Sequence, residues 1–336
     1  NNLKQVPGGN AEALLQGQAS GVTVTNSGVP GGGAAVRIRG ITSLGNASPL
    51  YIVDGVQSSN GLRDINADEI ESIQVLKDAG AAAIYGIQGS NGVVIVTTKK
   101  GHGKPTVSYS AYLGTQRPLT GNVWNLTNTQ EYAQAIWNME SNSGVAPSKR
   151  TPQFGLTGTS PVIPDYIIPE GAKEGDPNTN PSTYDIGSNQ IMKANKTGTD
   201  WFHEIFKPAM IQNHSLSVSS GNERSSYFFG INYFNQEGTL INTYLKKYDI
   251  RANTVFNIKD KIRVGENLSL VYRQAPGFTN QNEGNSISFT YRTPPIIPVY
   301  DIMGNFAGTH APHLSNSQNP VARQVRTEND KRNSRS

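Results

Sequence analysis

The residues that could carry out catalysis or bind a metal show no spacing in this sequence that stands out as an active site. The chain contains no cysteine, which excludes disulfides, thiolate metal ligands and cysteine nucleophiles. His310 and His313 stand close together, but Pro312 separates them and no carboxylate cluster is near, so they do not predict a metal site. No Ser-His-Asp order or carboxylate pair stands out elsewhere. The sequence therefore predicts neither an enzyme nor a cofactor.

The glycine-rich run at residues 28–33 could be compared with a phosphate-binding loop. It lacks the Gly-Lys-Ser/Thr ending of such a loop, and no helix is expected directly after it. The glycine spacing of a dinucleotide-binding fingerprint is also missing, because no glycine stands at the third position after Gly33. The run therefore predicts a flexible loop rather than a nucleotide site.

The charges are scattered along the chain. Lys and Arg number 29 against 25 for Asp and Glu, a net charge of +4, and no basic stripe or recognition-helix pattern predicts a nucleic-acid partner. No stretch approaches the roughly 20 apolar residues of a membrane helix, and no apolar signal-peptide core follows residues 1–4. The mean hydropathy of −0.46 still allows a transmembrane β-barrel, because its strands alternate apolar and polar residues.

The first part of the chain, up to about residue 104, predicts a small α+β domain. Short apolar or alternating runs end at glycine or at Asp-Gly, as strands do at turns. Asn10 is a candidate N-cap for a short helix, and an Ala-rich helical turn ends at Gly86. The expected helices cover 10–18 and 78–85, and the expected strands cover 21–25, 36–39, 50–53, 70–76 and 93–98.

From Thr106 onward the chain alternates over longer segments, each about ten residues long, which suits a tilted strand that crosses a membrane. In the first segment Val107, Tyr109 and Leu113 share one face and serines share the other. Glu266 breaks the pattern because it falls on an apolar face, and we expect it near the membrane interface, where a carboxylate costs little. The expected strands are 106–115, 214–220, 226–235, 248–258 and 262–272.

The connections between these strands differ in length according to the side on which they lie. The tight turns at 221–224 and 259–261 fall on one side, and the longer connections at 117–211, 236–246 and 274–335 fall on the other. Bacterial outer-membrane barrels have this asymmetry, with short periplasmic turns and long outer loops. Within the first long loop, Asn128 and Glu131 form a capping-box pattern that predicts an amphipathic helix. Residues 144–200 are expected to have little regular structure.

Several motifs of the first domain, in order and at the family's spacing, resemble the plug domain of TonB-dependent outer-membrane receptors, and specifically the SusC/RagA branch. Thr106 onward resembles the first barrel strands of that family. The motifs are LLQG at 14–17 with GVTV at 21–24, VRIRG at 36–40, PLYIVDGV at 49–56, IESIQVLKD at 70–78, AAIYG at 82–86 and NGVVIVTTK at 91–99.

The resemblance implies a plug domain at 1–104 followed by the N-terminal part of a transmembrane β-barrel at 105–336. A complete barrel of this kind has about 22 antiparallel strands, and the sequence accounts for about five. An open sheet would leave unpaired edges in the membrane, so we expect the sequence to be part of a longer chain. A TonB box and any N-terminal accessory domain would lie outside it. The implied location is the outer membrane, with the plug in the barrel lumen and the long loops extracellular.

Charged residues of the plug are candidates for a lock between plug and barrel. Arg37 and Arg39 share one face of their expected strand, from which they could pair with acidic residues on the barrel wall, and the resemblance favours this pairing for Arg39. Lys77, next to Asp78, is a further candidate. Solvation of a small domain is the simpler interpretation of the same charges. The pair at 54–55, Asp-Gly, is expected to form a tight turn with a structural role.

The implied function is TonB-dependent import of a bulky nutrient, either a glycan oligosaccharide or a peptide. The implied partners are a SusD-like surface lipoprotein, the TonB-ExbB-ExbD energising complex and outer-membrane lipid, and the resemblance allows a dimer of SusC-SusD pairs. Plug loops 43–49 and 57–62 are expected to contact the cargo, because their side chains suit hydroxyl-rich ligands. The candidate residues are Asn46, Ser48, Gln57, Ser58 and Asn60.

Other functions remain open on the sequence. A siderophore or cobalamin receptor would use the same scaffold, although the Asp-Gly turn and the AAIYG segment favour the SusC branch. A soluble β-rich adhesin or glycan-binding module would fold alone and fractionate without detergent. A transporter-like sensor would carry an additional N-terminal domain.

Overall fold

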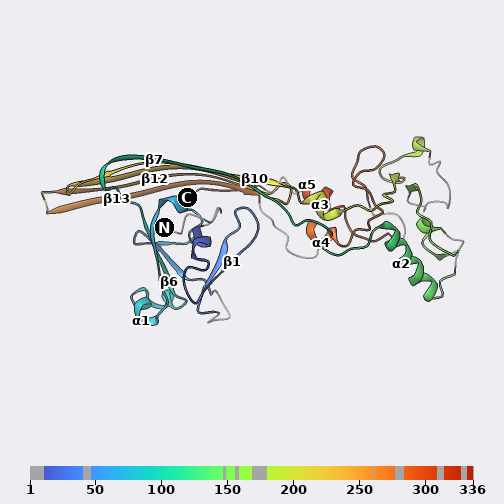
Figure 1. The fold of residues 1–336 in the computed structure, drawn as a ribbon, viewed down its shortest axis with the longest axis horizontal. Coiled ribbons are helices and arrows are strands. Elements are labelled where there is room, and N and C mark those ends of the chain that lie inside the picture. The colour runs from blue at the N-terminus through green and yellow to red at the C-terminus, as the bar shows by residue number, and fades with distance from the viewer. Residues whose placement is uncertain are drawn as a thin grey trace.

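The computed structural model describes residues 11–40, 47–146, 149–155, 159–168, 180–259, 261–276, 284–308, 314–326 and 331–335. Figure 1 shows a long sheet with an N-terminal unit (residues 11–102) against one of its faces and a loop lobe at one of its ends. The loop lobe consists of the described parts of 117–208, 238–243 and 284–326. Its helices lie far from the N-terminal unit (Figure 1).

The N-terminal unit is a small α+β domain, as the sequence predicts. Its four-stranded sheet has the order β4-β3-β6-β5, in which β3 and β6 are parallel and the other neighbours are antiparallel. A separate hairpin, β1-β2, and the helix η2 complete a shared apolar core that includes Leu14, Val36 and Val94. The strands are β1 Val22–Asn26, β2 Ala34–Ile38, β3 Leu50–Val53, β4 Val56–Ser58, β5 Ile70–Leu76 and β6 Val93–Thr98; the helices are η2 Ala11–Leu15, η3 Ala67–Glu69, α1 Ala79–Ala82 and η4 Ala83–Gly89.

The long sheet is antiparallel throughout, with the strand order β14-β13-β12-β11-β10-β7. All the predicted strands of the long sheet are present, and their pairing extends beyond the predicted bounds. A short strand that the sequence did not predict, β14, pairs with the end of β13. The strands are β7 Gly103–Gln116, β10 Ala209–Gly221, β11 Ser225–Glu237, β12 Tyr244–Ile258, β13 Ile262–Pro276 and β14 Lys331–Arg335.

The two faces of this sheet have the opposite polarity from those of a water-soluble protein. One row across β7 to β13 is entirely apolar, and its side chains are between 44% and 64% exposed. The other face lies toward the N-terminal unit and buries Asn232, Asp249, Arg251 and Asn253. A wall that is apolar outside and polar inside fits the lipid and the lumen of a membrane barrel. The exposed row, in cross-strand register, is Tyr109, Leu216, Ile231, Ile250 and Leu270.

Aromatic side chains form the next row of the outward face toward the loop lobe. The rings of His214, Tyr233, Tyr248 and Tyr272 follow one another across neighbouring strands at centroid distances of 5.1 to 6.3 Å. Tyr109 joins the row through a 2.8 Å hydrogen bond between its hydroxyl and Nδ1 of His214. Such a belt is typical of the boundary between the hydrocarbon and the headgroups of a bilayer.

Glu266 lies on the outward face, as its place in the sequence predicts. It is opposite Thr254, which is opposite Tyr227, so the polar groups share one level of the wall. The cross-strand pairs Phe256–Val264 and Ile258–Ile262 lie between this level and the tight turn that follows β12. Glu266 is therefore separated from that turn by apolar pairs.

The loop lobe has a core of its own, although the sequence predicts mostly irregular structure there. Phe154, Ile167, Ile205, Ile296 and Leu314 are fully buried in one apolar cluster. The predicted capping-box helix is present, with both hydrogen bonds of the box formed. No helix among the described residues is long and apolar enough to cross a membrane. The elements are α2 Thr129–Asn142, η6 Pro152–Phe154, β8 Tyr166–Ile167, η7 Pro181–Thr183, β9 Met192–Lys193, α3 Trp201–Ile205, α4 Ser286–Thr290 and α5 Pro320–Arg326.

A charge on the outward face should destabilise the wall much more than the same charge on the inward face. We expect Ile250→Lys to cost about 2–4 kcal/mol of unfolding free energy in lipid vesicles, because an ammonium group would be placed in the apolar band. Asn267→Lys is the matched control, since Asn267 lies opposite the inward-facing Asn253. Urea unfolding of both variants measures the difference. Equal losses would show that the exposed apolar face is not in contact with lipid.

Candidate functional site

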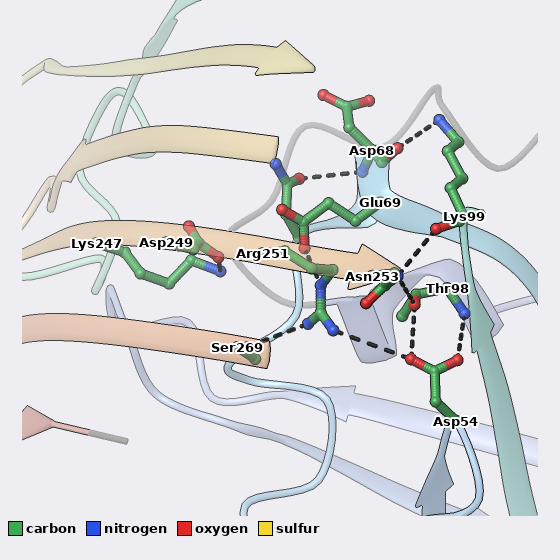
Figure 2. A network of polar contacts seen from close by, with 11 residues as sticks. Asp54, Asp68, Glu69, Thr98, Lys99, Lys247, Asp249, Arg251, Asn253 and Ser269 are labelled. Carbon is green, nitrogen blue, oxygen red and sulfur yellow. Dashed lines mark hydrogen bonds and ion pairs between the residues drawn. The ribbon is translucent and has the colours of Figure 1, made fainter. Parts of the chain in front are cut away.

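Polar side chains connect the N-terminal unit to the inward face of the sheet. Along β12, Asp249, Arg251 and Asn253 alternate with outward apolar residues, so all of them point toward the N-terminal unit. The facing residues of that unit stand where its elements end, at the turn after β3, in η3 and at the end of β6. Figure 2 shows these groups converging between the two parts.

The contact is centred on a buried ion pair between Arg251 of the sheet and Glu69 of the N-terminal unit. Nε of Arg251 donates to Oε2 of Glu69 at 2.7 Å, and the side chains are only 5% and 3% exposed. The same guanidinium donates to Oγ of Ser269 at 3.3 Å and lies 4.0 Å from the carboxylate of Asp54 (Figure 2). Removing one partner of a buried pair typically costs about 3–5 kcal/mol, because the other charge stays buried alone.

Gly230 leaves room for this pair. It lies opposite Arg251 in the register of β11 and β12. A Cβ atom there would be 3.3 Å from Oε1 of Glu69 and 3.1 Å from the ring of Phe228. The missing side chain therefore lets the carboxylate approach the strand.

Asp54 extends the contact through Thr98. The predicted Asp-Gly turn is present, with positive φ angles of 48° at Asp54 and 89° at Gly55. The Asp54 carboxylate accepts hydrogen bonds from the Thr98 amide at 2.9 Å and the Thr98 hydroxyl at 2.6 Å. Nδ2 of Asn253 then donates to that hydroxyl and to the carbonyl of Lys99, both at 2.9 Å. The turn thus joins β3 to β6 and, through Thr98, to the wall.

Asp68 connects the N-terminal unit to strands nearer the β7 edge of the same face of the sheet. Its carboxylate accepts a hydrogen bond from the Ser110 hydroxyl on β7 at 3.1 Å and a longer one from Nδ2 of Asn213 on β10 at 3.5 Å. Asn232 on β11 donates to the side chain of Asn213 at 2.7 Å. Together with the contacts of β12, these bonds attach the N-terminal unit to several neighbouring strands.

Of the basic residues predicted to lock the plug, Arg39 and Lys77 have observed partners within the N-terminal unit. Arg39 pairs with Asp78, and these side chains are 58% and 75% exposed. Nζ of Lys77 donates to the carbonyl of Ser20 at 2.6 Å, and Arg37 lies exposed on the β1-β2 hairpin. Their pairing with a barrel wall stays a prediction. In the contact described above, the wall supplies the arginine and the N-terminal unit supplies the carboxylates.

The proposed cargo residues converge in one pocket of the N-terminal unit. Ser48, Gln57, Ser58 and Asn60 line a cavity of about 500 Å³, while Asn46 lies outside the described residues. The antiparallel pairing of β3 and β4 brings the loops before and after this hairpin to the same end. The pocket is rich in hydroxyl and amide groups, as expected for a site that binds a polar ligand.

Glu12 also lines this pocket, and no motif in the sequence predicts its place there. Its Oε1 accepts a hydrogen bond from the Leu62 amide at 2.8 Å, whereas its buried Oε2 has no hydrogen-bond partner among the described residues. Burial raises the pKa of the Glu12 carboxyl above its ordinary value of 4.5, and the Leu62 amide only partly opposes this effect.

We expect Arg251→Met to loosen the N-terminal unit strongly. The free energy that holds the unit against the wall should fall by about 3–5 kcal/mol, because Glu69 would stay buried without a partner. Arg39→Ala is the control for an exposed pair and should cost no more than about 1 kcal/mol. Hydrogen exchange of the β5 and β6 amides in the intact protein, together with leakage of a large antibiotic into cells, reports the loosening. A larger effect from Arg39→Ala than from Arg251→Met would show that Arg39, and not Arg251, holds the N-terminal unit against the wall.

The raised pKa of Glu12 gives a pH dependence with a defined sign. The folded unit holds this proton more tightly than the unfolded chain, so the stabilisation is complete below the ordinary pKa of 4.5 and is lost as pH rises through the folded pKa. We expect Glu12→Gln to remove that loss. Hydrogen exchange of η2 between about pH 4 and pH 8 compares the two proteins. Identical pH profiles would contradict the assignment.

Comparison with known proteins agrees with this architecture. The family model of the TonB-dependent receptor plug domain matches residues 1–93. The chain is 33% identical over 96% of its length to TonB-dependent receptor P26 of Formosa agariphila, and 30% identical over 77% of its length to TonB-dependent receptor SusC of Bacteroides thetaiotaomicron. It spans 29% and 23% of those relatives.

A solved structure of the RagAB peptide importer in its open-open state superposes on the chain with a TM-score of 0.73 at 28% identity. The match covers 95% of this chain and 35% of that one. The closed-closed state of RagAB gives a TM-score of 0.71 at 27% identity, with the same coverage. The N-terminal unit is therefore a TonB-dependent receptor plug, and the chain belongs to the SusC-like TonB-dependent transporters as a plug with its adjoining barrel strands.

Proposed function

We propose that this chain forms the plug, which acts as the gate, and the first strands of the barrel wall of an importer. The importer carries a bulky nutrient across the outer membrane. The cargo class is an oligosaccharide or a peptide, and the energy comes from TonB. A SusD-like lipoprotein is the expected partner at the cell surface. The observation that carries the proposal is the polar contact between a plug and the inward face of a wall whose outward face is apolar.

The composition of this contact suits a part that has to move. The apolar core of the plug includes residues up to Val96 in the sequence and no described residue of the long sheet. The plug and the wall are therefore joined mainly by hydrogen bonds and ion pairs. Water can replace such bonds one by one, at a net cost of about 0.5–1.5 kcal/mol for a typical neutral bond. The plug can therefore be held firmly at rest and still yield to a directed pull.

The arrangement of the loops supports a path from the outside to the plug. The long connections form the loop lobe at one end of the wall, and the tight turns lie at the other end (Figure 1). On the proposed orientation, the loop lobe is extracellular and the plug lies in the barrel lumen. Cargo would meet the loop lobe first and then the plug pocket lined by Ser48, Gln57, Ser58 and Asn60.

Uptake measurements in the bacterium that carries the protein test this function. We expect deletion of the gene to abolish growth on one class of polymer fragment, oligosaccharide or peptide, and deletion of TonB to have the same effect. Purification of the tagged protein in detergent should also recover a surface lipoprotein. Uptake that continues without TonB would overturn the proposal, and uptake of only iron chelates or cobalamin would assign the chain to another cargo class.

The plug pocket gives a second test at the level of residues. We expect Gln57→Ala with Asn60→Ala to weaken cargo binding by the purified transporter about tenfold, since a few lost hydrogen bonds account for that change. Gln74→Ala on the exposed face of β5 is the matched control. Isothermal titration with the imported fragment measures both. Undiminished binding would remove these residues from the cargo site.

A further inference from the structure

The loop lobe contains a second cavity, separate from the plug pocket. It has a volume of about 540 Å³ and lies between stretches of chain that are far apart in the sequence, at 121–128, 197–202 and 291–295. The folding of the lobe around its own core brings these stretches together. A volume of this size is within the range of small-molecule sites, roughly 300–1,000 Å³.

Trp124 and Tyr291 give this cavity an exposed aromatic surface. They are 40% and 46% exposed, whereas the other tryptophans, Trp137 and Trp201, are 5% and 2% exposed. The Trp124 ring meets Tyr291 and Phe202 edge-on, at centroid distances of 5.5 and 6.0 Å. The lobe thus buries two of its indoles and keeps the third at the wall of a cavity.

Several bonds fix the position of Trp124. Its indole Nε1–H donates to Oγ1 of Thr290 at 3.1 Å. The side chain of Asn122 closes the turn around it, by donating to the Leu126 carbonyl at 2.6 Å and accepting from the Leu126 amide at 2.8 Å. Helix α2 begins directly afterwards with a complete capping box. An aromatic ring that is held in place before binding loses little entropy when a ligand arrives.

Charged groups of both signs also line the cavity. Asp200 remains 58% exposed although it pairs with the ring of His203. Arg292 lies with its guanidinium 5.8 Å from the centre of the Phe289 ring. A carboxylate only accepts hydrogen bonds and a guanidinium only donates them, so a neutral ligand that both donates and accepts can satisfy the two together. A sugar ring has such hydroxyls around its edge and a C–H face that can pack on an aromatic ring.

We propose that this cavity is an outer binding site for one sugar ring of an oligosaccharide, which packs on Trp124 and Tyr291 and bonds to Asp200 and Arg292. The proposal rests on the import function and narrows its cargo to the oligosaccharide class. The site would capture cargo at the loop lobe before the plug pocket is reached. It is independent of the plug–wall contact, which shares none of its residues.

Titration of the intact transporter in detergent tests the site. The probes are linear hexasaccharides of glucose, xylose and mannose, with a pool of random hexapeptides for contrast. We expect at least one hexasaccharide to bind, Trp124→Ala to weaken it at least tenfold, and Trp124→Phe to have a smaller effect because it keeps a ring. Tyr291→Ala is a second variant, on a side of the cavity far from Trp124 in the sequence. Met139→Ala, exposed on α2 and outside the cavity, is the matched control.

The possible results separate the site from the import function. Hexasaccharide binding that survives both Trp124→Ala and Tyr291→Ala would overturn the site while leaving the importer intact. Peptide binding that depends on Trp124, or no hexasaccharide binding at all, would overturn the assignment to sugar. Failure of the import function would appear instead as growth of the parent strain on the polymer fragment that continues after TonB is deleted. Circular dichroism and gel mobility without heating check that each variant is folded.

Discussion

The attachment of the plug to the strand wall is centred on the burial of Arg251 against Glu69. A wall in contact with lipid has to place its apolar side chains outward, so its polar side chains face the lumen. The plug is therefore attached mainly through polar groups, and charges that leave water need matched partners. Asp54, Thr98 and Asn253 extend the pair into a network that reaches both plug strands and wall.

The same constraint explains why the molecule has several small cores rather than one. The plug buries its own apolar cluster around Leu62 and Val94, and the loop lobe buries another around Phe154 and Ile296. In the wall, which lies between these two cores, most of the large apolar side chains point outward. The parts are then connected by strands and polar bonds, so each can shift without opening the core of another.

Much of the fold could be predicted from the sequence, because the relevant signals are local. Alternation predicted the strands β7, β10, β11, β12 and β13 and their faces, and the short motifs predicted the plug. The loops around Ser48 and Gln57 were both proposed from the sequence, and the structure shows that the β3-β4 hairpin brings them together. The Glu69–Arg251 pair could not be found in this way, since 182 residues separate its members and neither belongs to a distinctive motif. Most of the core of the loop lobe was missed because buried residues such as Phe154, Ile296 and Leu314 lie outside long helices and strands.

The separate core of the loop lobe has a consequence for how such proteins change over evolutionary time. Substitutions around Trp124 or Phe154 alter the packing of the lobe, while Glu69, Arg251 and the plug core keep their own contacts. If the proposed function holds, the loop lobe can therefore diverge under selection for new nutrients while the plug–wall contact is kept. After gene duplication, each copy could then acquire a different cargo specificity while the plug–wall contact stays the same.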